Sequence, residues 1–182
     1  MALRKAVDNL CVFDPGFRMY AEKFLAEMGG NSAVEPVSSM ADLDSAIHSY
    51  SNVRFLEVCL HGSPGMIEFA DGVVMVGHHL GNMMHGVPFL AKNARVLFNS
   101  CNIAEGAAGD NFMERLGQTM LAGKGGIIGG STAKTHNYFP RGSFVTEMYI
   151  APLSFGRLKV RRYDESGSQV GERVVDRHGI SR

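Results

Sequence analysis

Cysteine is scarce in this sequence of 182 residues, and neither sign of charge is in excess. The three cysteines, Cys11, Cys59 and Cys101, lie too far apart for a disulfide framework or for the paired spacing of a zinc site. Eighteen Lys and Arg balance eighteen Asp and Glu, so the formal net charge is zero. The sequence therefore gives no electrostatic reason to expect a nucleic-acid partner or an anionic membrane surface.

Long apolar runs are also missing. Arg4 and Lys5 are followed by Asp8 and Asn9, which interrupt the chain before the apolar region of a signal peptide. No stretch is long enough to span a bilayer. We therefore expect a cytoplasmic protein with no membrane partner; export by a route without a cleavable signal would leave no mark of this kind.

What the sequence does contain is enough apolar material, 45% of residues, to form one well-buried core. Apolar segments of strand length alternate with segments of helical periodicity over the first 130 residues, which favours a mostly parallel sheet covered on both faces. We predict one domain over residues 1–182, with a core at about 10–135 and C-terminal strands and a hairpin at 144–176.

The boundaries of the expected elements follow from apolar spacing, caps and turn residues. Strands are expected at 10–13, 34–37, 53–60, 66–70, 73–76, 94–98, 125–130, 144–150, 158–163 and 169–175. Helices are expected from Asp14-Pro15 to Gly29-Gly30, from Ser39 to about 50, and over 110–121. Asp71-Gly72 favours a two-residue hairpin turn, Ser166-Gly167 lies between the last two strands, and 77–92 is expected to be irregular with a short helix.

Two apolar strands end in reactive side chains. The segment 53–60 ends at His61-Gly62, and the segment 94–98 is followed by Asn99-Ser100-Cys101. If these strands are adjacent and parallel, His61 and Cys101 lie at the same edge of the sheet, where ligands of such sheets bind. An imidazole is suited to activating a thiol near neutral pH, and the N–H groups of Gly62 and Cys101 could stabilise an oxyanion. The pattern predicts a cysteine nucleophile with a histidine base.

These residues resemble the caspase, metacaspase and gingipain superfamily of cysteine peptidases (clan CD), and most closely an uncharacterised bacterial branch found in large surface proteins. The resemblance covers roughly residues 10–135. The matching residues are Asp14, His61-Gly62-Ser63-Pro64-Gly65, Ile67, Cys101-Asn102-Ile103-Ala104, Gly109 and Gly129-Gly130-Ser131-Thr132.

The resemblance implies a caspase-like three-layer α/β/α sandwich and a thiol protease of clan CD type. His61 would be the general acid and base, and Cys101 would attack the scissile carbonyl of a peptide or protein substrate. Asp14 and Asn99 would set selectivity, with Ser131 and Thr132 also assigned to substrate binding. Because Asp14 is acidic and Asn99 is neutral, we expect cleavage after Arg or Lys with a weakened electrostatic preference.

Several alternatives compete with this hydrolase. An isolated buried cysteine usually acts as a small hydrophobe, and Cys11 and Cys59 are expected to be core residues. No carboxylate at a recognised spacing accompanies the histidines at 78, 79 and 85, so no metal is expected. The glycines at 123–130 fit neither phosphate-loop spacing, and Ser63 lacks the spacing of a nucleophile elbow.

No cofactor is expected, and the sequence leaves the oligomeric state open. The rival function is a catalytically inactive caspase-like module that binds a protein strand in the same cleft for recognition or targeting. Retention of His61, Gly62 and Cys101 favours activity, whereas the neutral Asn99 favours the rival.

Overall fold

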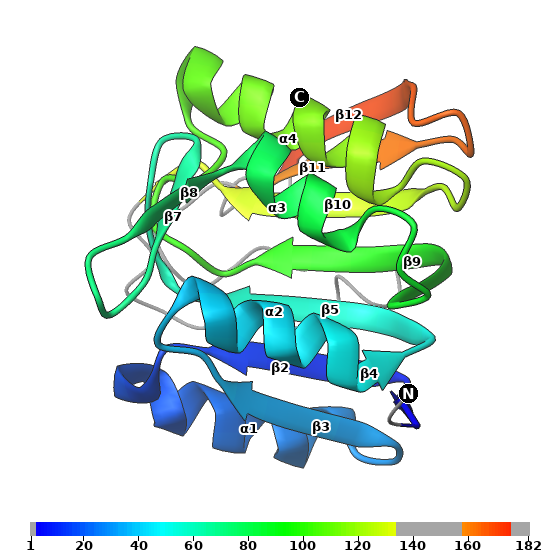
Figure 1. Cartoon of the computed structure of the whole chain (residues 1–182). Helices are drawn as coiled ribbons and strands as arrows, with labels where there is room; N and C mark the ends of the chain where they lie inside the picture. The colour runs from blue at the N-terminus through cyan, green and yellow to red at the C-terminus, as the bar shows by residue number, and fades with distance from the viewer. Residues whose placement is uncertain (1–2, 134–157, 176–182) are drawn as a thin grey trace.

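The computed structural model describes residues 3–133 and 158–175, where a seven-stranded sheet has the order β12-β11-β10-β9-β5-β2-β3 (Figure 1). Its strands are β2 (Asn9–Phe13), β3 (Ser32–Pro36), β5 (Val53–Cys59), β9 (Leu90–Phe98), β10 (Gly126–Ser131), β11 (Leu158–Tyr163) and β12 (Gln169–Val175). The pairs β2/β3, β2/β5, β5/β9 and β9/β10 are parallel, whereas β10/β11 and β11/β12 are antiparallel. The predicted α/β class with a mostly parallel sheet is confirmed.

Helices cover the two faces of the sheet unequally. The described residues form η1 (Pro15–Phe17, a 3-10 turn), α1 (Arg18–Met28), α2 (Met40–Ser49), α3 (Gly77–Met84) and α4 (Gly106–Met120). Helices α2, α3 and α4 lie on the face toward the viewer in Figure 1. Helix α1 packs on the opposite face, where Phe24 stacks on Phe55 with ring centroids 6.1 Å apart. None of the helices in this part of the chain is long and apolar enough to cross a membrane.

Strand β5 lies between two hydrophobic cores. Leu56 and Val58 point into the core beneath α2, α3 and α4, while Phe55 and Cys59 point into the core beneath α1. Because successive side chains of a strand face opposite sides, a nearly continuous apolar run is what a parallel strand buried on both faces requires. Arg54, near the start of β5, is exposed, and the polar residue within the buried part of the run is Glu57, whose side chain is fully buried.

Some boundaries differ from those predicted. β9 begins at Leu90 rather than at 94, because Leu90 pairs with Val53 before a register shift, and Asn93 within it has a positive φ of 55°. α4 begins at Gly106 rather than at 110. A Cβ at Gly109 would lie 2.2 Å from the backbone of Ala104, so this small residue lets the first turn of α4 pack closely.

Two smaller sheets complete the described structure. β6 (His61–Ser63), β7 (Met66–Glu68) and β8 (Val74–Val76) form an antiparallel sheet, and β1 (Lys5–Ala6) pairs in parallel with β4 (Tyr50–Ser51). The turn between β7 and β8 is longer than predicted: Phe69 N donates to Val73 O, which leaves three residues in the loop. Gly72 occupies its left-handed position with φ 80°, as three-residue hairpin loops require.

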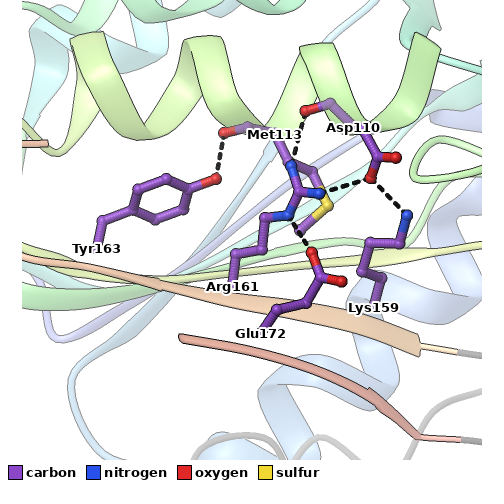
Figure 2. A network of polar contacts seen from close by, with 6 residues as sticks. All are labelled: Asp110, Met113, Lys159, Arg161, Tyr163 and Glu172. Carbon is purple, nitrogen blue, oxygen red and sulfur yellow. Dashed lines mark hydrogen bonds and ion pairs between the residues drawn. The ribbon is translucent and has the colours of Figure 1, made fainter. Parts of the chain in front are cut away.

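The antiparallel strands are attached to α4 by a polar network (Figure 2). Arg161 on β11 donates through Nη2 to Asp110 Oδ1 at 2.6 Å, through Nη1 to the Asp110 carbonyl at 2.8 Å, and through Nε to Glu172 Oε2 at 2.6 Å. Lys159 Nζ reaches the same Asp110 oxygen at 2.6 Å, and the Tyr163 hydroxyl donates to the Met113 carbonyl at 2.8 Å. The expected strand at 144–150 lies outside the described residues.

Candidate functional site

The strands that precede His61 and Cys101 are neighbours and run parallel, as the predicted dyad requires. β5 and β9 pair in parallel with Val58 opposite Phe98, and Asn99 N donates to Val58 O at 2.9 Å just beyond the ladder. His61 begins β6 directly after β5, and Cys101 follows β9 by three residues. Both residues therefore leave the sheet at its carboxyl edge.

A small pocket with a cavity volume of about 50 Å³ opens at this edge. Its lining residues are Phe17, Tyr20, Cys59, Leu60, His61, Asn99 and Cys101. His61 is exposed, Cys101 is half-buried, and the His61 ring packs against Phe17 with ring centroids 4.7 Å apart. The structure thus brings the two predicted catalytic residues and Asn99 to one cavity.

Gly62 lies where the two strand ends approach most closely. A Cβ at this position would be 2.8 Å from Ser100 Cβ, 2.9 Å from Cys101 O and 3.2 Å from Cys101 N. Distances this short exclude any larger side chain unless the backbone shifts. The absence of a side chain on Gly62 keeps its backbone beside that of Cys101, as the predicted pair of oxyanion donors requires.

Asp14 closes β2 as a helix cap. Its Oδ1 accepts from Gly16 N at 2.8 Å, its backbone N donates to Cys59 O at 2.9 Å, and the residue is buried. The contribution of this segment to the pocket wall is Phe17, one turn further on. Asp14 is not among the lining residues of the pocket in the described part of the chain, and its role in selectivity stays a prediction.

Ser131 and Thr132 close β10, next to the loop that carries Cys101. Ser131 is buried, its hydroxyl donates to Ala133 O at 2.8 Å, and its carbonyl accepts from Ala104 N at 2.9 Å. Neither Ser131 nor Thr132 lines the pocket as the described residues form it. Their observed position supports the Cys101 loop, and direct substrate binding by them stays a prediction.

Glu57 is the residue that sequence reasoning overlooked. It is fully buried on β5, and its Oε1 accepts from Asn99 Nδ2 at 3.1 Å and from Cys59 Sγ at 3.3 Å. Contact with the Cys11 thiol, burial and the charge of Glu57 raise the pKa of Cys59, which keeps this thiol protonated as a donor. The available signal was a carboxylate inside a strand expected to be buried on both faces.

The histidines at 78, 79 and 85 are not among the lining residues of the pocket that the described part of the chain forms. His78 and His79 begin α3 with ring centroids 3.9 Å apart, and His85 Nδ1 lies 3.2 Å from Thr119 O. Among residues 3–133 and 158–175, no three His, Cys, Asp or Glu side chains are grouped as metal ligands.

Comparison with known proteins gives a family without an assigned activity. The sequence profile described as "Domain of unknown function (DUF4347)" matches residues 30–135, a range that includes His61, Asn99, Cys101 and Ser131. No curated protein matches the chain. Since the profile covers more than half of the sequence, the chain belongs to the DUF4347 family.

Proposed function

We propose that this protein is a caspase-like cysteine peptidase of clan CD type, in which Cys101 is the nucleophile and His61 the general acid and base. The observation that carries the proposal is the shared pocket: His61 and Cys101 follow two adjacent parallel strands and line the same cavity. The small antiparallel sheet that begins at His61 and the helices on both faces of the main sheet support the caspase-like arrangement.

The chemistry proceeds by acyl transfer. The Cys101 thiolate forms a bond to the scissile carbonyl carbon while the carbonyl electron pair moves to oxygen, beside the backbones of Gly62 and Cys101. Collapse of this intermediate breaks the C–N bond, and protonated His61 gives its proton to the departing amine. A water then loses a proton to His61 and attacks the thioester, which releases the carboxylic acid and restores the Cys101 thiolate beside protonated His61.

The direct test is covalent labelling with a peptidyl electrophile that carries Arg before the reactive group. We expect one adduct per chain on Cys101, identified by peptide mass, and none in Cys101→Ala. His61→Ala should slow labelling at neutral pH by about 100-fold, the lower end of general base contributions. Cys59 serves as an internal control because it lines the same pocket but has a raised pKa. Equal modification of accessible thiols, unaffected by His61→Ala, would point to the inactive binding module.

A second test asks whether Cys101 is part of the core. Cys101→Ala should change the free energy of unfolding by less than about 0.5 kcal/mol, because the residue is half-buried at a loop. The matched variant Leu97→Ala, at a fully buried position of the strand behind it, should cost about 2–5 kcal/mol through cavity formation. A similar loss in both variants would make Cys101 a packing residue and contradict the proposal.

A further inference from the structure

The wall of the pocket beside Cys101 is backed by a buried carboxylate. Asn99 and Cys59 both line the pocket, and both donate to the same oxygen, Oε1, of the fully buried Glu57. Glu57 itself is not part of the lining. It can therefore influence a ligand through the two side chains that stand between it and the cavity.

The contact fixes which end of the Asn99 amide turns inward. Glu57 Oε1 accepts a hydrogen bond from the Cys59 thiol. The part of Asn99 that also lies at hydrogen-bond distance from this oxygen must be a donor, which is the NH₂ group of its amide. The other end of the amide, Oδ1, is then left for the pocket. An acceptor at this wall favours a ligand that brings N–H donors.

Two other lining residues favour the same class of ligand. Phe17 and Tyr20 are aromatic and line the cavity, and cations bind favourably over aromatic faces. A Lys or Arg side chain would place donors against Asn99 Oδ1, with the Glu57 carboxylate one residue behind. A substrate aspartate before the scissile bond would instead place its negative charge against the Asn99 Oδ1 acceptor, near the Glu57 carboxylate.

We infer that Glu57 is the residue that determines selectivity in this pocket: by holding the Asn99 amide with its oxygen outward, it sets the pocket for an Arg or Lys side chain. The inference rests on the proposed function, and it assigns to Glu57 the role that the sequence assigned to Asp14. Glu57 acts through Asn99 and is a positioning residue.

Glu57→Gln tests the inference. The measurement uses two peptidyl electrophiles, one with Arg and one with Leu before the reactive group. The rate of Cys101 labelling by the first divided by the rate for the second is the Arg/Leu ratio. A glutamine amide can donate to Asn99 Oδ1, so the Asn99 amide is released to rotate and turn its NH₂ group outward. We expect the Arg/Leu ratio to fall about tenfold, as loss of one hydrogen bond predicts. The change should fall mainly on the binding constant of the Arg electrophile, with the maximal rate of alkylation nearly unchanged. Glu22→Gln, on the exposed surface of α1, is the matched control and should leave the ratio unchanged.

A charge swap separates this role from a merely structural one. In Asn99→Asp two carboxyl groups would lie at hydrogen-bond distance and share a proton, so the Arg/Leu ratio should change by less than about twofold. In the double variant Glu57→Gln, Asn99→Asp, the introduced glutamine amide can donate to the new carboxylate, and the Arg preference should return. A side chain needed only for folding would not be rescued in this way.

These experiments distinguish a failure of the proposed function from a failure of the inference about Glu57. If no peptidyl electrophile labels Cys101, the proposed function is wrong and the inference falls with it. If Cys101 is labelled but the ratio responds to Asp14→Asn and not to Glu57→Gln, the proposed function stands and the inference is overturned. If Glu57→Gln does not fold, Asn99→Asp decides alone: a rise in the ratio of tenfold or more would overturn the inference, and a change below twofold would support it.

Discussion

Two polar clusters lie against the same sheet, and they are built from different groups. Beneath α4, two carboxylates meet a guanidinium and an ammonium, and the guanidinium makes three hydrogen bonds to protein atoms (Figure 2). Beside the pocket, the Glu57 carboxylate accepts hydrogen bonds from the Asn99 amide and the Cys59 thiol, and both of these side chains line the cavity. Opposite charges that pair with each other stabilise a fold. Side chains that donate to a buried carboxylate and also line a cavity have a fixed orientation, and that orientation decides which polar atoms a ligand meets. The difference suggests a structural role for the first cluster and a binding role for the second.

The largest effect that separates the clusters is expected from Arg161→Met. Loss of the guanidinium leaves the Asp110 carbonyl and the Glu172 carboxylate without their donor, so we expect unfolding free energy to fall by about 3 kcal/mol. Urea unfolding gives this value, while the rate of Cys101 labelling in the folded protein should not change. Arg18→Met, whose side chain is 82% exposed in its pair with Glu22, should cost less than about 0.5 kcal/mol. A parallel loss of labelling in Arg161→Met would mean that the clusters are coupled.

A pair of glycine substitutions sharpens the comparison. An added Cβ would collide with the Cys101 backbone in Gly62→Ala and would lie 2.0 Å from the Tyr163 ring in Gly117→Ala. Each should cost about 1–3 kcal/mol through overpacking. Only Gly62→Ala should slow the labelling of Cys101, by about tenfold or more, since it displaces the backbone at the reactive edge. Equal labelling rates in the two variants would contradict a role for Gly62 at the site.

A smaller effect, with a defined pH window, is expected from Tyr163→Phe. Burial raises the pKa of Tyr163 to about 12 from an ordinary 10.0, and the neutral hydroxyl donates to Met113 O. The folded state therefore binds this proton more tightly, so its contribution is complete below pH 10 and is lost as pH rises toward 12. Tyr163→Phe should be less stable by about 1 kcal/mol near neutral pH. That difference should shrink above pH 10, and a difference that grows with pH would contradict the assignment.

The smallest effect should come from Lys159→Met. Lys159 shares one Asp110 oxygen with Arg161, so removing its ammonium leaves that carboxylate paired. We expect a change below about 1 kcal/mol in unfolding free energy. A loss as large as that of Arg161→Met would show that the ammonium holds β11 to α4 as strongly as the guanidinium does.

The edge of the sheet that carries the site could be predicted because its signals are local. Each of the two apolar runs ends abruptly at a polar residue, and the alternation with helices requires parallel strands whose ends share one edge. The position of His61 and Cys101 at one edge followed from these signals, whereas their catalytic roles also rested on the family resemblance and stay predictions. Asn99, which the resemblance assigned to substrate selectivity, directly follows β9 and lines the pocket, and its role in selectivity stays a prediction.

Glu57 could not be interpreted in the same way. A strand buried on both faces gives no alternation, so the sequence does not say which core a polar residue enters or which partners it meets. Cys59 lies two residues along the same strand and shares the face of Glu57, whereas Asn99 follows β9 and becomes a neighbour only through the pairing of β5 with β9. The early start of β9 was hidden for a related reason, because polar residues at 92 and 93 interrupt its apolar pattern.

The loop that follows Cys101 has a consequence for the thermodynamics of binding. Asn102 N donates to Ala133 O at 3.0 Å and Ala104 N to Ser131 O at 2.9 Å, so two successive contacts tie this loop to the end of β10. These amides should exchange slowly with deuterated water, at rates closer to those of the central strands than of exposed turns. A ligand that enters the pocket then meets a loop whose conformational entropy was lost on folding, and its affinity is not reduced by ordering that loop.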